Sequence, residues 1–300
     1  MIAIDLGSNT IRFIEYDGIS WGKSFEKIVR TAQSLHATTR ICEEAFGRII
    51  GAINEAKACL DFSNNEVVAV TTAALRMASN GEEILGRINE DCGIKFTIID
   101  GEREANLTLT AVKNRLNELQ INSARFILAD IGGGSTELIT YDHEKTDTIS
   151  LPIGIVTMCE KAVDRPMLHQ LLDDFEQKVS LFHRSLGNTV EYTRLVLTSG
   201  TPTTIAAYRM GMDYSSYDPK KINGSILTRA DCIQTYQELM DMDESMRAMY
   251  VGVGREELIA TGILMVESLF KGLDLEEAII VDDGLREGVA LDYFIPKSFI

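Results

Sequence analysis

A motif that occurs twice limits the folds open to this chain more than anything else in its sequence. In each copy an apolar strand ends in an aspartate, and a glycine-containing turn leads into a second apolar strand. The copies read AIDLGSNTIRFI and LADIGGGSTELI, and their aspartates, Asp5 and Asp130, lie 125 positions apart. Each copy has the turn chemistry of a β-hairpin. The duplication predicts an internal repeat and two related domains.

The rest of the chain alternates short apolar runs with segments whose apolar residues recur at helical spacing, which predicts an α/β protein. A length of 300 residues suits two domains. We expect them at 1–122 and 123–300, with the last helix packing back on the first domain. Beyond the hairpins, expected strands are 67–71, 94–99, 147–152, 195–198 and 278–281. Expected helices are 40–60, 73–90, 102–119, 166–186, one from 201, 255–270 and a closing helix.

Charge and cysteine content exclude several classes of protein. The net charge of −16 repels nucleic acid, so none is expected as a partner. A phosphate-chain substrate would be repelled too, unless arginines, helix amino termini or a metal reverse the local potential. The five cysteines form no CxxC pair and predict reduced, mostly buried thiols. Without a leader-like segment or a membrane-length apolar run, a cytoplasmic protein is expected.

The two turns are the first candidates for chemistry. A strand that ends in aspartate before a glycine-rich turn brings a carboxylate and several backbone N–H groups together, which suits a metal-bound phosphate. For either turn alone, ordinary hairpin geometry explains the glycines equally well. The duplication shifts the balance towards phosphate binding.

Six segments together resemble one known family. IDLGSNTIR, TTAALR followed by Asn80, DGEREA, DIGGGSTEL, SGT at 199–201 and DDGLREG occur in this order. The chain thereby resembles the exopolyphosphatase/guanosine pentaphosphate phosphohydrolase (Ppx/GppA) family over nearly its whole length. The resemblance implies the actin-like ATPase (ribonuclease H-like) superfold, with two βββαβα domains around a cleft. It also implies a hydrolase that releases terminal phosphate from polyphosphate or guanosine pentaphosphate, the latter a nucleotide of the stringent response.

The resemblance also assigns roles by position. It makes Glu104 the general base, and it makes Asp130, Glu137 and Asp5 the carboxylates around Mg²⁺, with Mn²⁺ as the alternative ion. The implied phosphate-binding residues are Ser8, Asn9, Thr10, Arg12, Arg76, Gly132, Gly133, Gly134, Ser135, Gly200 and Thr201. Taken alone, three of these residue types also fit purely structural roles: Glu104 suits a helix amino terminus, Asp130 a turn cap, and Glu137 the solvent face of a strand.

Two other functions remain open at this stage. A kinase or ATPase of the same superfold would use similar turns, although the glutamate motif and Pro202 count against it. A sensor of guanosine tetra- or pentaphosphate would bind without turnover, although retention of Glu104, Asp130 and Glu137 counts against that. The sequence chooses neither between polyphosphate and the nucleotide nor between a monomer and a homodimer.

Overall fold

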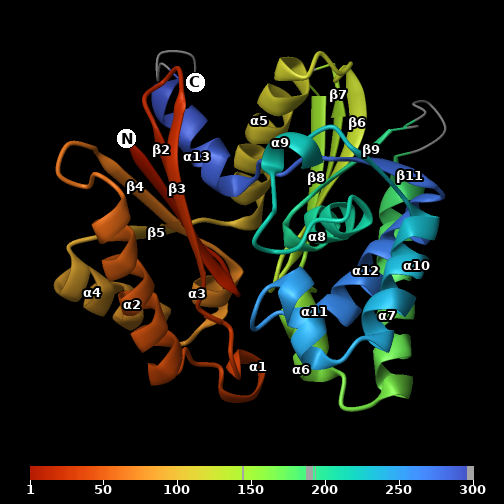
Figure 1. Ribbon diagram of the computed structural model, residues 1–300, viewed down its shortest axis with the longest axis horizontal. Helices are drawn as coiled ribbons and strands as arrows, with labels where there is room; N and C mark the ends of the chain where they lie inside the picture. The colour runs from red at the N-terminus through yellow and green to blue at the C-terminus, as the bar shows by residue number, and fades with distance from the viewer. Residues whose placement is uncertain (144, 187–191, 193, 296–300) are drawn as a thin grey trace. The chain divides into compact units, whose positions relative to one another are not determined.

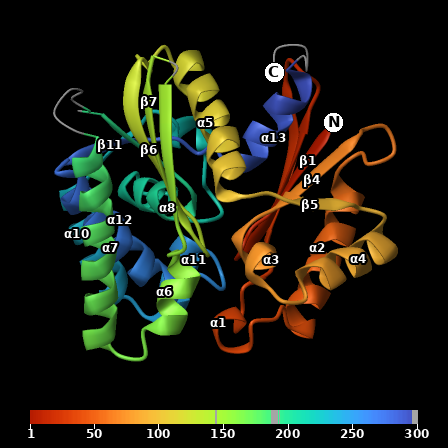
Figure 2. The same ribbon diagram turned by 180° about the vertical axis from the view of Figure 1, so that it is seen from behind.

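The computed structural model describes residues 1–143, 145–186, 192 and 194–295 (Figures 1 and 2). Its internal contacts divide the chain into two compact units: unit 1 comprises Met1–Ala111 with Asp283–Ile300, and unit 2 comprises Val112–Asp282. The division lies inside helix α5 (Gly101–Glu118), which runs unbroken from one unit into the other. The sequence predicts the boundary after residue 122, within the loop that follows α5, because a helix interior gives no boundary signal.

Unit 1 is built on a five-stranded sheet with the order β3-β2-β1-β4-β5. Its strands are β1 (Ile2–Leu6), β2 (Thr10–Tyr16), β3 (Trp21–Ile28), β4 (Val67–Thr71) and β5 (Phe96–Ile98). Its helices are α1 (Leu35–Thr38), α2 (Glu43–Cys59), α3 (Ala73–Met77), α4 (Gly81–Cys92), the first part of α5, and α13 (Leu285–Phe294). Helix α13 packs on β1 and β2, and its Leu285, Val289 and Ala290 join a buried cluster with Ala3 and Leu107.

Unit 2 is built on a six-stranded sheet with the order β10-β11-β9-β6-β7-β8. Its strands are β6 (Arg125–Ile131), β7 (Thr136–Asp142), β8 (Lys145–Leu151), β9 (Leu195–Thr198), β10 (Ile226–Thr228) and β11 (Glu277–Ile280). Its helices are α6 (Ile155–Lys161), α7 (Arg165–Ser185), α8 (Gly200–Arg209), α9 (Pro219–Ile222), α10 (Arg229–Asp241), α11 (Glu244–Val251) and α12 (Leu258–Leu273). The apolar α12 packs against α6, α7, α8 and α10 and anchors the core.

The strand order confirms the predicted repeat. In unit 1 three antiparallel strands, β3-β2-β1, continue into parallel β4 and β5. In unit 2 the antiparallel β8-β7-β6 continue into parallel β9 and β11, with β10 added at the edge. Each of the two glycine-containing turns, after Asp5 and after Asp130, therefore joins a central strand to its antiparallel neighbour.

The predicted helix over 73–90 is wrong, because the chain leaves the helical path after Met77 and α4 starts only at Gly81. Asn80 ties this break to a distant segment: its side chain accepts from the Ile41 N–H at 2.8 Å and donates to the Ile41 carbonyl at 3.0 Å. Gly81 packs so closely that a Cβ there would collide with the carbonyl oxygen of Leu75. These contacts are tertiary and leave no trace in helical periodicity.

The cysteines are free, as expected, but the prediction that most of them are buried is wrong. Cys92 and Cys232 are buried, Cys59 is exposed, and the other two are intermediate. Burial raises the pKa of the Cys232 thiol to about 12, so this side chain is a core residue without thiolate chemistry. Within the described part of the chain, no helix combines the length and hydrophobicity required to cross a membrane.

Candidate functional site

The first turn of unit 1, Gly7 to Thr10, is closed by a hydrogen bond from the Gly7 N–H to the Thr10 carbonyl oxygen at 2.9 Å. The segment after β3 holds the outer side of this turn. Val29 and Arg30 both donate their N–H groups to the Asn9 carbonyl oxygen at 2.9 Å. The carbonyl groups of Asn9 and Thr10 are thereby occupied by backbone donors.

The second turn, in unit 2, repeats this construction. The Gly132 N–H donates to the Ser135 carbonyl oxygen, again at 2.9 Å. The first residues of α6 hydrogen-bond to the turn. The Ile155 N–H donates to the Gly132 carbonyl at 3.0 Å and the Val156 N–H to the Gly133 carbonyl at 2.8 Å. The repeat seen in the sequence therefore extends to individual hydrogen bonds.

The backbone N–H groups of the second turn are arranged to bind an anion. Among the described residues, those of Gly133, Gly134 and Ser135 donate to no other residue, although the carbonyl groups of Gly132, Gly133 and Ser135 accept hydrogen bonds. Neighbouring unsatisfied N–H groups form an anion-binding concavity. None of these glycines has a positive φ. The residue that must be glycine for steric reasons lies in the facing segment. A Cβ on Gly154 would lie 2.5 Å from the Gly133 backbone, so only glycine lets this segment pack against the turn.

Two predicted metal ligands lie together beside this turn. Asp130 at the end of β6 pairs across the ladder with Glu137 on β7. Glu137 is 1% exposed and accepts from the Ser150 hydroxyl at 2.7 Å, so it does not lie on a solvent face. Over the described residues, no group of three or more His, Cys, Asp or Glu side chains is suitably placed for a metal. Two carboxylates beside an anion-binding turn fit Mg²⁺, which keeps waters and takes its other ligands from substrate phosphates.

Glu104 and Arg76, assigned separately from sequence, meet in unit 1. The Arg76 Nη1 lies 3.5 Å from the Glu104 Oε2 and also donates to the Ile99 carbonyl at 2.6 Å. Helix α5 exposes Glu102 but buries Glu104 to 9% exposure. Helix-dipole stabilisation accounts for Glu102, whereas it gives no reason to bury Glu104. A buried carboxylate beside an arginine is the arrangement expected at a reactive site.

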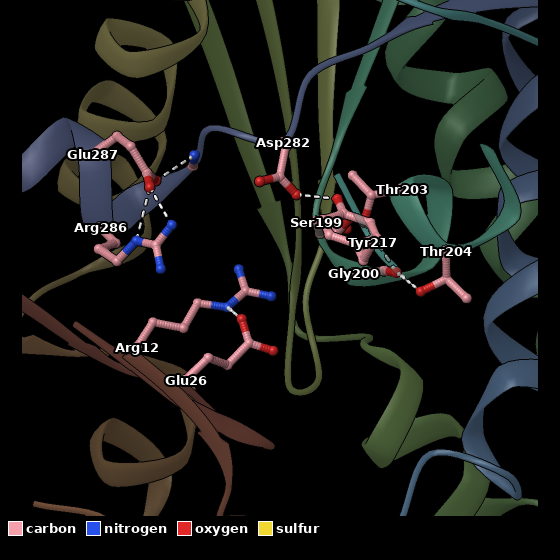
Figure 3. A network of polar contacts seen from close by, with 11 residues as sticks. Arg12, Glu26, Ser199, Gly200, Thr203, Thr204, Tyr217, Asp282, Arg286 and Glu287 are labelled. Atoms are coloured by element: carbon pink, nitrogen blue, oxygen red, sulfur yellow. Dashed lines mark hydrogen bonds and ion pairs between the residues drawn. The ribbon is translucent and has the colours of Figure 1, made fainter. Parts of the chain in front are cut away.

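Arg12 and Arg286 of unit 1 are each paired with a glutamate (Figure 3). Arg12 on β2 lies opposite Asp5, and its Nε lies 3.0 Å from Glu26 on β3. In α13, the Nε of Arg286 donates to the buried Glu287 at 2.7 Å. Both guanidinium groups are therefore oriented by a neighbouring carboxylate.

The predicted SGT turn follows β9 in unit 2, where Asp130 lies opposite Thr198. The Thr201 side chain is buried against Gly262 of α12, where a Cβ on that glycine would lie 2.6 Å from its hydroxyl. Thr201 therefore offers a ligand its backbone N–H at the start of α8. Arg255 approaches Gly200, since a Cβ there would lie 3.4 Å from its Nη2.

Ser199 has the strained backbone of this turn, with φ 85° and ψ 173°, a region that is essentially restricted to glycine. Its buried hydroxyl oxygen has no hydrogen-bond partner among the described residues. We expect Ser199→Gly to be about 1 kcal/mol more stable to unfolding than Ser199→Ala, since both remove the hydroxyl but only glycine relieves the strain. Denaturant unfolding of both variants measures this difference, and equal stabilities would contradict the strain.

Sequence reasoning missed four features of these sites. Gly154 and Arg255 fall in no motif, Ser199 lies in the SGT motif without a role assigned to it, and the contacts of all three are tertiary. The fourth is the hydrogen bond from the Tyr217 hydroxyl to the Asp282 carboxylate, which joins residues 65 positions apart. For Asp282 a signal existed, because it opens the DDGLREG motif and directly follows the apolar residues 278–281.

The chain matches known proteins over most of its length. Residues 23–295 match the model of the Ppx/GppA phosphatase family. Exopolyphosphatase 2 of Mycobacterium tuberculosis is 28% identical over 314 aligned positions, which cover 96% of this chain and 97% of the relative.

Solved structures agree with this match. The crystal structure of the Aquifex aeolicus member of the Ppx/GppA family superposes with a TM-score of 0.75 at 27% identity, covering 100% of this chain and 98% of that one. An exopolyphosphatase from Cytophaga hutchinsonii, at 23% identity and a TM-score of 0.82, covers 97% of both chains and supports the fold alone. The predicted actin-like class, with two α/β units, is confirmed.

Proposed function

The chain belongs to the Ppx/GppA phosphatase family, and from this membership we propose that it is a Mg²⁺-dependent phosphohydrolase. It would release the terminal phosphate of inorganic polyphosphate or of guanosine pentaphosphate. The observation that carries the proposal is the second turn, where the N–H groups of Gly133, Gly134 and Ser135 lie beside the paired Asp130 and Glu137. Anion donors next to two carboxylates suit a phosphate group that binds together with a divalent cation.

In the proposed reaction, the residues of each unit have the roles that the family resemblance implies. In unit 2, the turn N–H groups would bind phosphate oxygens, while Asp130 and Glu137 would hold Mg²⁺. The ion, when bound, would supply positive charge against the negative charge of the phosphate chain. In unit 1, Glu104 takes the proton of the attacking water and Arg76 binds a phosphate oxygen. A new P–O bond to water forms as the terminal anhydride P–O bond breaks, and the shortened chain leaves with the electron pair.

The ion pair of Arg76 with Glu104 supports these two roles. At 3.5 Å the pair keeps the carboxylate oriented, yet Arg76 remains partly exposed, so a phosphate can reach its guanidinium. Planar guanidinium groups bind phosphate oxygens in a bidentate manner.

We place the reaction in the cytoplasm, because all five cysteines are free thiols, the state favoured by a reducing compartment.

Phosphate release from polyphosphate, guanosine pentaphosphate and ATP, with Mg²⁺ and with a chelator, tests the proposal. We expect release from the first two and none in the chelator. Asp130→Asn should raise the Mg²⁺ concentration for half-maximal rate, by about tenfold or more, because one anionic ligand is lost. Asp147→Asn makes the same charge change on an exposed position of the same sheet and should leave that concentration unchanged.

Two outcomes would contradict the proposal. Tight binding of guanosine pentaphosphate without phosphate release would make the protein a sensor. Release from ATP alone would make it an ATPase or kinase of the same superfold.

A further inference from the structure

Three parallel strands of unit 2 end at one edge of the sheet, and each is followed by a polar group. Asp130 at the end of β6 lies opposite Thr198 on β9, and β11 pairs with the other side of β9. Asp282 follows the paired part of β11 by two residues. Neighbouring strands lie about 4.8 Å apart, so Asp282 lies roughly 10 Å from Asp130 along this edge. Open α/β sheets bind their ligands at such an edge.

Asp282 and Tyr217 form a fixed pair there. The Tyr217 hydroxyl donates to the Asp282 carboxylate, and Figure 3 shows the two side chains pointing towards each other. The backbone beneath is also fixed: the Asp282 N–H donates to the Asn223 side chain at 2.7 Å, and the Gly224 N–H donates to the Ile280 carbonyl at 2.8 Å. Both side chains are partly exposed, so a ligand can reach them.

The chemistry along this edge changes from one end to the other. At β6 the turn offers N–H donors beside metal-binding carboxylates, and at β9 the start of α8 has the Arg255 guanidinium against Gly200. Both positions suit phosphate. At β11, Asp282 adds a carboxylate, which accepts hydrogen bonds and repels the negative charge of a phosphate. A third phosphate is therefore disfavoured there.

From this order we propose that Tyr217 and Asp282 form the nucleoside subsite of the enzyme. The Asp282 carboxylate would accept hydrogen bonds from ribose hydroxyls or from the N–H groups of a base, and the preferred substrate would be a nucleoside polyphosphate. A carboxylate that binds ribose hydroxyls at the end of a neighbouring strand is a known solution in dinucleotide-binding sheets. The proposal rests on the proposed function and decides between its two substrates.

The test compares guanosine pentaphosphate with tripolyphosphate, which lacks the nucleoside, in the wild type, Asp282→Asn and Tyr217→Phe. We expect Asp282→Asn to lower kcat/KM for the nucleotide by at least about tenfold and to leave tripolyphosphate within about twofold. Tyr217→Phe should also lower the ratio of kcat/KM for the nucleotide to kcat/KM for tripolyphosphate, because the Asp282 carboxylate loses the hydroxyl that holds it. Asp213→Asn is the matched control, since that carboxylate is held by Ser215 and Ser216 in the same segment.

An equal loss on both substrates would overturn the subsite and leave Asp282 a structural residue. An unchanged ratio in Asp282→Asn would overturn it as well. If the wild type hydrolyses neither substrate, the proposed function fails separately, and calorimetric binding of guanosine tetraphosphate then decides the subsite. Weaker binding to Asp282→Asn than to the wild type supports it, whereas equal binding refutes it.

Discussion

Glu104→Gln is expected to lose about 100-fold to 10,000-fold of the rate of phosphate release, with substrate binding retained. The amide keeps the size of the side chain and its place on α5, yet it cannot take a proton from water. Arg76 loses its anionic partner at 3.5 Å but keeps its hydrogen bond to the Ile99 carbonyl, so it stays in position. Steady-state kinetics should therefore show a fall in kcat with little change in KM.

Glu102→Gln is the matched control for this experiment. Glu102 lies in the same first turn of α5, makes the same contribution to net charge and is exposed. Its substitution should leave kcat within a factor of about two, because only a small helix-dipole interaction changes. Comparable losses in both variants would show that the first turn of α5 acts through its charge and would remove Glu104 from the role of base.

Gly154→Ala should lower activity by about 100-fold although Gly154 contributes no side chain to the chemistry. A Cβ at this position would lie 2.5 Å from backbone atoms of Gly133 and Gly134, so the second turn or α6 must move. Misplacing reacting groups by about 1 Å can cost that factor, and the overpacking itself should destabilise unit 2 by about 1–3 kcal/mol. Kinetics together with denaturant unfolding measure the two effects.

Gly272→Ala separates displacement of the turn from loss of stability. Its Cβ would meet Val179 at 2.7 Å in the interior of unit 2, in the packing of α12 on α7. This variant should be destabilised to a similar extent and yet keep the activity of the folded fraction. If Gly272→Ala loses as much activity as Gly154→Ala, stability alone explains both results and the turn has no special role.

The sequence predicted the parts of the fold that depend on neighbours in the chain. Strands 67–71 and 195–198 have the predicted ends. Short apolar runs between turn residues are local signals, so their limits are readable. Strand β10 was missed because its three residues are too few for a pattern. The break between α3 and α4 was missed because Asn80 makes it through contacts with Ile41.

The sequence by itself determined the repeated strand–turn–strand motif, the α/β class and the family. Each follows from residues close together in the chain or from motifs that occur in a fixed order. Only the tertiary structure decided that Glu104 is buried beside Arg76, that Gly154 packs against the Gly132–Ser135 turn, and that Tyr217 reaches Asp282. Those facts depend on which segments the sheets and helices bring together. Such proximity is fixed by packing across tens of residues, and no local pattern encodes it.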